Sequence, residues 1–315
     1  MAFLPDETPW TGGRISEGVY CYKANNPSPM SYVGTNIYIV SPQGFPGLNE
    51  ENTTAKAPEA LVIDPAPSGK TVDEIIALTK RLGVKIGAVA LTHHHHDHSE
   101  GACELIVKSA QCQQVDVASI PLYAKAFALE EAQTIATQTS TVLPPQAEKI
   151  SFIPVGEGSV IELAKKVNLE VIDIPGHSAD SLAFLFSQDK VLFIGDIAFR
   201  HGPTVVYHPD GVLWDYMNSL DTLDKLAQEN PGIVFASGHG TLIDNPKECI
   251  DATRTHRVER LNQIIHALDE GVEAVDEALV DAVYVDIDPR LRPAALRSVQ
   301  AQLLYLQSEK EKAKL

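Results

Sequence analysis

The chain has 315 residues, 44% of them apolar, so it is long enough to bury a substantial hydrophobic core and is neither fibrous nor disordered. Lysine and arginine number 25 against 42 acidic residues, and the resulting net charge of −17 disfavours a surface that wraps nucleic acid. The four cysteines form no C-x-x-C pair, so the sequence predicts neither a disulfide framework nor a thiolate zinc site.

The N-terminal ten residues, MAFLPDETPW, lack the basic start and the long apolar run of a secretion signal. No stretch reaches the roughly 20 apolar residues that a membrane-spanning helix needs. We therefore expect a cytoplasmic protein with no membrane association, in a reducing compartment that suits free cysteines.

Strand-like and helical patterns alternate along the first two-thirds of the chain. Short apolar runs that end at glycine, proline or an acidic residue predict strands at 35–40, 60–64, 88–92, 169–174, 182–186, 191–194 and 233–236. Helical patterns lie between several of these runs, at 72–82 and 216–228. This alternation predicts an α/β fold in which helices pack outside sheets.

Two regions depart from this alternation. Residues 42–58, rich in proline, glycine, asparagine and glutamate, are expected to form a surface loop that serves either as a lid or as decoration. After residue 245 the chain becomes helical, with helices expected at 254–268, 272–283 and 293–310. We therefore divide the chain into a main domain of residues 1–245 and a helical appendage of residues 246–315.

Five of the eleven histidines fall within the segment 92–101, THHHHDHSEG, which follows a predicted strand and precedes a predicted helix. In an extended loop, residues i and i+2 point to the same side, so His93 and His95 can converge on one metal ion while Asp97 and His98 serve a neighbour. Imidazole and carboxylate suit zinc, manganese or iron. The alternative is a tag-like polyhistidine stretch in which Asp97 caps the following helix and Glu100 completes the cap.

Three further polar residues follow apolar strands, and each is preceded by a glycine that permits a tight turn: His177, Asp196 and His239. For each one taken alone, a hydrogen-bonded core histidine or a turn aspartate is the ordinary interpretation. Their shared context, after the histidine cluster, favours a metal site instead.

This ordered set resembles the H-x-H-x-D-H signature and the later His, Asp and His of the metallo-β-lactamase fold superfamily. The resemblance implies a four-layer αββα sandwich, with Asp97 and Asp196 in catalytic roles and Asp64, in LVIDP, orienting metal ligands from outside the metal centre. It also implies two divalent ions, zinc first with manganese or iron as alternatives, and a hydroxide between them that attacks the substrate. The implied ligands are His93, His95 and His177 for one ion, Asp97, His98 and His239 for the other, and Asp196 for both.

Residues 26 to about 305 resemble the β-lactamase-like protein 2 group, on the segments NPSPMSYVGTNIYIV (26–40), PGHS (175–178), DYMNSL (215–220) and GHG (238–240), with His256 and Arg257. That group includes an animal mitochondrial endoribonuclease and fungal thioesterases that act on carrier-bound polyketides. Its winged-helix-like C-terminal segment is similar to residues 272–310, although no wing hairpin is evident here. His94 and His96 depart from the group's usual residues, and they are either substrate-facing or solvent-facing.

The resemblance further implies that the appendage packs beside the metal cleft and brings Arg254 or Arg257 to an anionic part of the substrate. Two apolar faces of the appendage must then be buried. They consist of Val272, Val275, Leu279 and Val283, and of Leu296, Val299, Leu303 and Leu306.

Three classes of function compete. A small-molecule hydrolase of a thioester, lactone or other activated ester suits the acidic surface, with β-lactam-like amides as a variant. A nuclease would use Arg254, Arg257 and Arg260 as a basic stripe, unless these arginines form ion pairs on a solvated helix face. A mononuclear-iron sulfur dioxygenase would use the same ligand types. We expect a small-molecule substrate rather than nucleic acid, and a homo-oligomer stays open.

Overall fold

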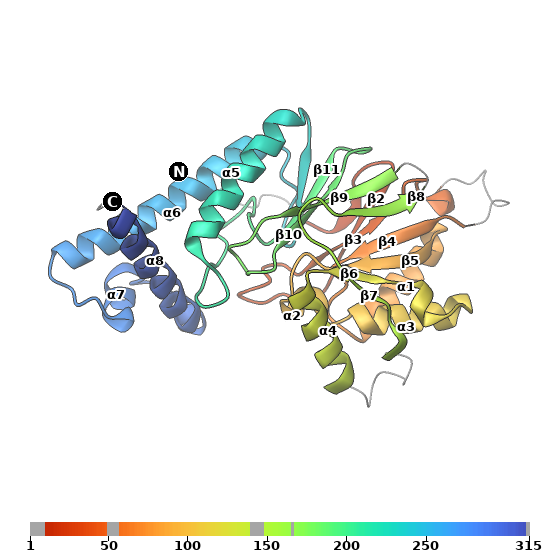
Figure 1. The fold of residues 1–315 in the computed structure, drawn as a ribbon, viewed down its shortest axis with the longest axis horizontal. Coiled ribbons are helices and arrows are strands. Elements are labelled where there is room, and N and C mark those ends of the chain that lie inside the picture. Colours follow the sequence, from red (N-terminus) through yellow and green to blue (C-terminus); the bar gives the residue numbers. More distant parts are fainter. Residues whose placement is uncertain (1–9, 49–56, 139–147, 165–166, 313–315) are drawn as a thin grey trace.

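A computed structural model describes residues 10–48, 57–138, 148–164 and 167–312, and in it two β-sheets face each other with helices on both outer sides (Figure 1). The first sheet runs in chain order, antiparallel from β1 to β4 and parallel from β4 to β7. Its strands are β1 (Gly12–Arg14), β2 (Val19–Lys23), β3 (Asn36–Val40), β4 (Glu59–Ile63), β5 (Lys85–Ala90), β6 (Leu122–Ala124) and β7 (Phe152–Pro154).

The second sheet has the order β12-β11-β10-β9-β8, antiparallel except for the parallel pair β11 and β12. Its strands are β8 (Val160–Ala164), β9 (Val167–Asp173), β10 (Leu182–Phe186), β11 (Val191–Gly195) and β12 (Val234–Ser237). The parallel pair places the ends of β11 and β12 side by side, which determines where the residues after them lie.

The helices complete the layers. Residues of α1 (Lys70–Leu82), α3 (Ala102–Gln113) and α4 (Ala126–Gln138) share a core with the first sheet, and α5 (Leu213–Glu229) and α6 (Pro246–Asp269) share one with the second. The short α2 (His96–Ser99) follows β5, and α7 (Asp276–Val283) and α8 (Arg292–Lys312) end the described chain. None of the described helices is both long enough and apolar enough to cross a bilayer.

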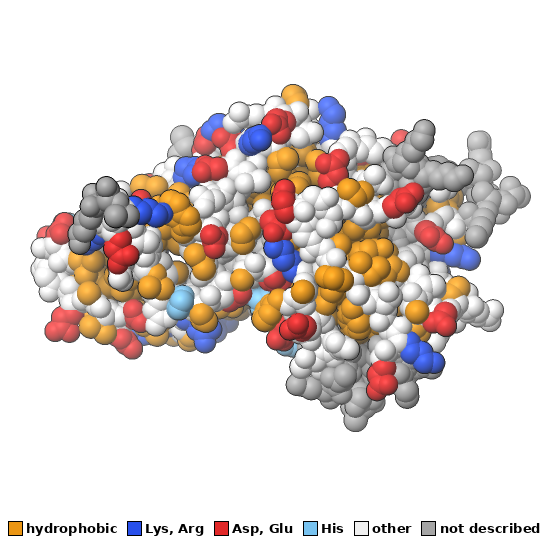
Figure 2. All heavy atoms as spheres, in the orientation of Figure 1, with side chains coloured by type: hydrophobic (Ala, Val, Ile, Leu, Met, Phe, Trp, Pro, Cys, Tyr) orange, Lys and Arg blue, Asp and Glu red, His pale blue; other side chains and the backbone are white. Residues whose placement is uncertain are grey.

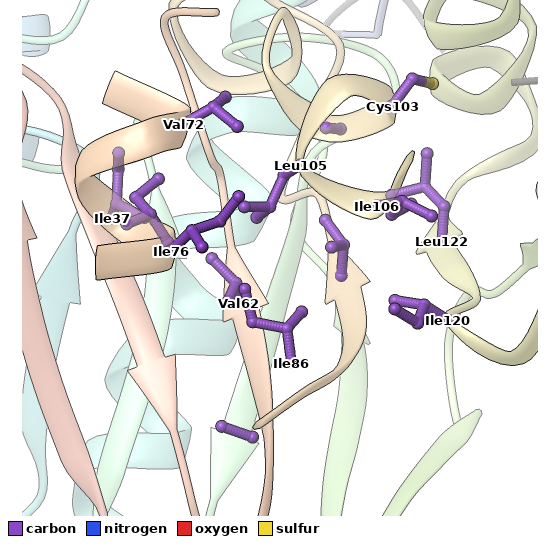
Figure 3. Close-up of a cluster of buried hydrophobic side chains, with 14 of the residues drawn as sticks. Ile37, Val62, Val72, Ile76, Ile86, Cys103, Leu105, Ile106, Ile120 and Leu122 are labelled. Atoms are coloured by element: carbon purple, nitrogen blue, oxygen red, sulfur yellow. The ribbon is translucent and has the colours of Figure 1, made fainter. Parts of the chain in front are cut away.

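Strand side chains alternate between the layers, as the two-residue period of a strand requires. Along β10, Leu182, Phe184 and Phe186 lie in the core between the sheets, whereas Ala183 and Leu185 face the core under α5. Figure 3 shows the corresponding outer core of the first sheet, where strand residues such as Val62 lie beside Leu105 of α3. Each fully buried aliphatic side chain contributes about 1.5–3 kcal/mol, so three such cores hold the sandwich together.

The four-layer α/β sandwich expected from the resemblance is confirmed, and every predicted strand and helix overlaps an observed one. The sequence reading missed β1, β2, β6, β7, β8 and α4. Three of these strands have only three residues each, which is too short for an alternation to be recognised.

The C-terminal helices form a fourth core together with α6. Leu279 of α7 and Val299 of α8 pack there against Ile264, as the predicted apolar faces require. Val275 is an exception: it precedes α7 and is 47% exposed, so its expected burial is wrong. Residues 246–312 contain helices and no strand, in agreement with the absent wing hairpin.

The proposed boundary at residue 245 stays a prediction. Ile250 and Leu261 of α6 pack in the core of the second sheet, and Ile264 and Ala267 pack with α7 and α8. The continuous helix α6 therefore packs both against the main domain and against the other C-terminal helices.

The expected loop at 42–58 is described only in part, because residues 49–56 lie outside the described residues. Phe45 is buried in the outer core of the first sheet, and Gly47 packs against the backbone at the end of α1. That end of α1 leads into the start of β5, opposite the strand end at which the histidine cluster lies. The described part of the loop is therefore no lid over the cluster.

Gly176, in the turn between β9 and β10, should not tolerate a side chain. Its φ is 130°, and an added Cβ would lie 2.2 Å from the backbone nitrogen of Tyr216. We expect Gly176→Ala to lower the free energy of unfolding by about 2 kcal/mol or more, because backbone atoms cannot yield as a flexible side chain can. Urea denaturation measures the loss, with Gly156→Ala as control because its Cβ would meet nothing closer than 3.7 Å. Equal stabilities of the two variants would contradict this account of the turn.

Candidate metal centre

The predicted ligands all lie just beyond strand ends at one edge of the sandwich. His93 and its neighbours follow β5, Asp196 follows β11 directly, and His239 follows β12. The structure brings His93, His95 and His177 within ligand distance of one another, and does the same for Asp97, His98 and His239. The folded chain thus assembles two three-residue groups from three separate segments.

The first group is built from three imidazole nitrogens. His95 Nδ1 lies 3.0 Å from His93 Nε2 and 3.0 Å from His177 Nε2. In the second group, His239 Nε2 lies 3.3 Å from His98 Nε2 and 3.3 Å from Asp97 Oδ2.

Asp196 lies between the two groups. Its Oδ2 is 3.8 Å from His177 Nε2 and 3.3 Å from His239 Nε2, and its Oδ1 is 3.4 Å from His98 Nε2. Oδ1 is buried without a hydrogen-bond partner among the described residues. A buried carboxylate oxygen in that state is suited to a cation.

Asp64 orients one histidine of each group. Its carboxylate accepts hydrogen bonds from the Thr92 backbone nitrogen (2.8 Å) and from the Thr92 hydroxyl (2.7 Å), and His98 Nδ1 donates to it at 3.0 Å. Because the Thr92 hydroxyl proton is used on Asp64, its oxygen accepts from His93 Nδ1 at 3.0 Å. Asp64 is therefore well placed for the supporting role that the resemblance implies.

The remaining three rings are held in the same way. His177 Nδ1 donates to the Val205 carbonyl at 2.7 Å, and His239 Nδ1 donates to the Gly34 carbonyl at 3.2 Å. His95 is reversed: its Nε2 donates to Asp210 at 3.0 Å, which turns Nδ1 inward. Sequence reasoning missed Asp210, because in the segment HPDG (208–211) it reads as an ordinary turn residue.

In the neutral form of each ring, these tautomers leave every inward nitrogen of the five histidines with a lone pair. Acceptor atoms only, five nitrogens and the oxygens of Asp97 and Asp196, then face a common space. Such a convergence of acceptors is suited to bound cations, so the residues present fit the implied metal ions.

The surroundings lower the pKa of two of the clustered histidines and raise the pKa of two others. Burial lowers the pKa of His177 to about 4 and holds the pKa of His93 well below its usual value, with neighbouring imidazoles adding to the effect. Burial also opposes charge on His239, but Asp196 and Asp97 raise its pKa to about 9, and the pKa of His98 is likewise raised by Asp196 and Asp97. Burial alone would raise the pKa of Asp97, yet His98 and His239 lower it to about 2.

His94 does not point away from its neighbours, as an extended loop would require. The strand ends at Ala90, and the His94 ring lies 4.7 Å from the ring of His95. Its Nδ1 is 2.9 Å from the buried Asp180, and both rings approach Asp210. Burial opposes charge on His94, but Asp180 and Asp210 raise its pKa. His96 is exposed, begins α2 and lines the mouth of the cleft.

Gly238 permits the close packing of the site. A Cβ there would lie 2.2 Å from Asp196 Oδ1 and 2.6 Å from His98 Cε1. The glycine before His239 is thus required by close approach rather than by a turn alone.

A cleft of about 360 Å³ opens over the cluster. Its wall includes the apolar side chains of Met30, Tyr32 and Phe199, and Tyr207 stacks parallel to His95 with centroids 6.2 Å apart. The guanidinium of Arg297, from α8, lies over the same Tyr207 ring, 5.6 Å from the ring centre. Figure 2 shows histidine side chains in pale blue between the C-terminal helices and the sheets.

The arginines of α6 do not form the basic stripe that a nuclease would use. Arg254 forms an ion pair with Asp221 at 2.7 Å, as in the ion-pair alternative, and lines neither the cleft nor a larger cavity beside it, so of the two arginines named as possible anion partners it is not the one beside these spaces. Arg257 is buried and lines that larger cavity, and Arg260 lies over Tyr284. Steps of three residues rotate around the helix, so the three side chains meet different surroundings.

Known proteins resemble the chain in both sequence and fold. A protein named beta-lactamase-like protein 2 homolog from Caenorhabditis elegans is 27% identical and covers 93% of this chain and 85% of its own length. A homolog of the same name from Drosophila melanogaster is 26% identical over 98% of this chain and 92% of its own. A beta-lactamase domain protein from Burkholderia ambifaria has the same fold, with a TM-score of 0.72 at 18% identity over 96% of this chain and 91% of its own.

Two protein families match separate parts of the chain. Residues 277–311 match the beta-lactamase-associated winged helix domain. Residues 59–239, which include Asp64 and all seven predicted ligands, match the metallo-beta-lactamase superfamily. The chain therefore belongs to the metallo-beta-lactamase superfamily.

Proposed function

We propose that the protein is a metal-dependent hydrolase that cleaves a thioester, a lactone or another activated ester of a small molecule. The observation that carries this proposal is Asp196, whose buried carboxylate lies between two groups of converging ligand atoms and has one oxygen unpartnered among the described residues. A carboxylate so placed is suited to contact two cations at once.

His93, His95 and His177 would hold one ion, Asp97, His98 and His239 the second, and Asp196 both. Bound there, divalent ions would acidify a water molecule and polarise the bond to be broken. The mixed nitrogen and oxygen ligands favour zinc, and manganese or iron fit the same ligand types.

The described lining of the cleft offers no hydroxyl or thiol nucleophile of the serine or cysteine type. Neither serine nor cysteine is among the described residues that line the cleft. Burial raises the pKa of the Cys103 thiol to about 12, so that cysteine carries no reactive thiolate. What the cleft walls supply is orientation: Tyr207 stacks on His95, and Asp180 and Asp210 hold the neighbouring His94 ring.

Charge supports a small substrate over nucleic acid. The net charge is −17, and on the face shown in Figure 2 lysine and arginine side chains are scattered among acidic ones. Of the three arginines that a nuclease would use as a basic stripe, Arg254 is paired with Asp221 and Arg257 is buried. A phosphate backbone would meet few accessible cations there.

Removing a ligand should remove metal and activity together. We expect His95→Ala and Asp196→Asn each to lose at least about half of the bound metal, and activity to fall roughly hundredfold or more. His94→Ala is the matched control: its ring nitrogens face Asp180 and Asp210 rather than the cluster, so metal content should stay. Metal analysis together with turnover tests this, and full activity of Asp196→Asn would contradict the two-ion arrangement.

Metal uptake should release protons. In the metal-free site, the carboxylates raise the pKa of His98 and His239 above neutrality, whereas metal ligation requires both rings to be unprotonated. We expect zinc binding at pH 7 to release roughly two protons per chain, and fewer as the pH rises above 9. A pH indicator in weak buffer measures this release during titration of the metal-free protein. Uptake without any proton release would mean that these two histidines do not bind the metal.

The substrate class is open to a direct comparison. A thioester or lactone should be hydrolysed far faster than single-stranded RNA at about 150 mM salt, where weak phosphate contacts are screened. The same panel should include a β-lactam, because an acidified water molecule can attack any strained amide that fits the cleft. Efficient RNA cleavage at that salt would instead support a nuclease.

A further inference from the structure

A second and larger cavity, of about 990 Å³, adjoins the metal cleft. It lies between the loop of residues 28–33, the segment 203–205, α6 and the chain between α7 and α8. Pro29, Tyr32, Pro203 and Val205 line both spaces, so the two adjoin each other. A molecule bound over the histidine cluster could extend into this cavity.

Arg257 is the unusual residue of the cavity. The residue is only 7% exposed. Its guanidinium donates a hydrogen bond to the Thr204 carbonyl, and the guanidinium carbon lies 5.0 Å from the centre of the Tyr216 ring. Its Nε is buried with no hydrogen-bond partner, and no ion pair joins it to a carboxylate within the described part of the chain. A buried guanidinium in that state gains from an anion that pairs with it.

Arg260 adds a second positive charge to the same wall. It donates to the Val283 carbonyl at 3.1 Å and lies 4.5 Å from the centre of the Tyr284 ring. Burial together with these two arginines lowers the pKa of His256 to about 4, so that ring adds no charge of its own. Asp286, the one acidic residue of the lining, is exposed.

The cavity is connected to the metal centre through the segment 203–205. Thr204 accepts from Arg257 and donates its hydroxyl to the Asp196 carbonyl at 2.8 Å, while the Val205 carbonyl accepts from His177. The arginine and a metal ligand are thus anchored on adjacent residues. Most of the remaining lining is apolar, with Ile287, Leu291 and Ala294 among it.

We propose that this cavity binds the part of the substrate remote from the bond that is cleaved, and that this part is an apolar chain ending in a carboxylate or a similar anion. The apolar lining would bury the chain, and Arg257 and Arg260 would pair with the anion. The proposal deepens the proposed function: water adds its hydroxyl to the acyl carbon, the thiol or alcohol leaves with the proton, and the far end of the acyl chain is held by the arginines.

Direct binding tests the cavity without any reaction. Octanesulfonate is an apolar anion and a poor metal ligand, so its calorimetric titration into the metal-loaded protein reports on the arginines. We expect binding to weaken roughly tenfold to hundredfold in Arg260→Gln, the range for loss of a hydrogen bond to a charged group. Ala294→Trp, which fills the cavity, should also weaken it. Arg254→Gln is the matched control and should bind like the wild type, because Arg254 pairs with Asp221 outside the cavity.

Matched thioesters extend the test to turnover. Suberoyl and octanoyl thioesters of the same thiol share chain length and scissile bond but differ in the terminal carboxylate. We expect the suberoyl ester to have a kcat/KM at least tenfold higher, and Arg260→Gln to remove most of that advantage, because only the suberoyl ester carries an anion for Arg260 to pair with.

The two experiments separate this inference from the proposed function. If neither ester is hydrolysed but octanesulfonate binds in an arginine-dependent way, the thioesterase proposal fails and the cavity assignment stands. If both esters are hydrolysed equally and octanesulfonate does not bind, or binds equally to Arg260→Gln, the cavity assignment is overturned.

Discussion

A single buried carboxylate orients both halves of the candidate metal centre. Asp64 is only 2% exposed and has a φ of 54°. Its carboxylate accepts hydrogen bonds from the backbone nitrogen and the hydroxyl of Thr92 and from Nδ1 of His98. Through Thr92 it also determines which nitrogen of His93 faces inward. One ligand of each three-residue group is therefore oriented by the same carboxylate, His98 directly and His93 through Thr92.

The sandwich makes this arrangement possible because strands of both sheets end at the same edge. Asp64 and the histidine cluster follow neighbouring parallel strands of the first sheet, while Asp196 and His239 follow a parallel pair in the second. The core between the sheets, which includes Tyr38 and Phe193, fixes the distance across which the ligands meet. α8 and α6 approach the same edge, where Arg297 lies over Tyr207 and Arg257 donates to the Thr204 carbonyl.

The convergence of the candidate ligands was predictable from sequence because their signal is local. Five histidines in one loop and a glycine before each later ligand can be read without knowing the fold, and the structure brings those residues together. Asp210 was not predictable: its role depends on the inward rotation of His95, a tertiary contact over 115 positions. Spacing likewise could not distinguish Arg254 from Arg257, because only the packing of α6 decides which of them is buried. The short strands β6 and β7 exist through their neighbours in the sheet rather than through their own sequences.

The central claim is that Asp196 joins two metal positions into one centre. X-ray diffraction from crystals of the metal-loaded protein, recorded above and below the absorption edge of the bound metal, locates the ions directly. The account predicts two anomalous peaks roughly 3.5–4 Å apart, one beside His93, His95 and His177, the other beside Asp97, His98 and His239, with Asp196 touching both. A single peak, or a peak that Asp196 does not reach, would contradict it.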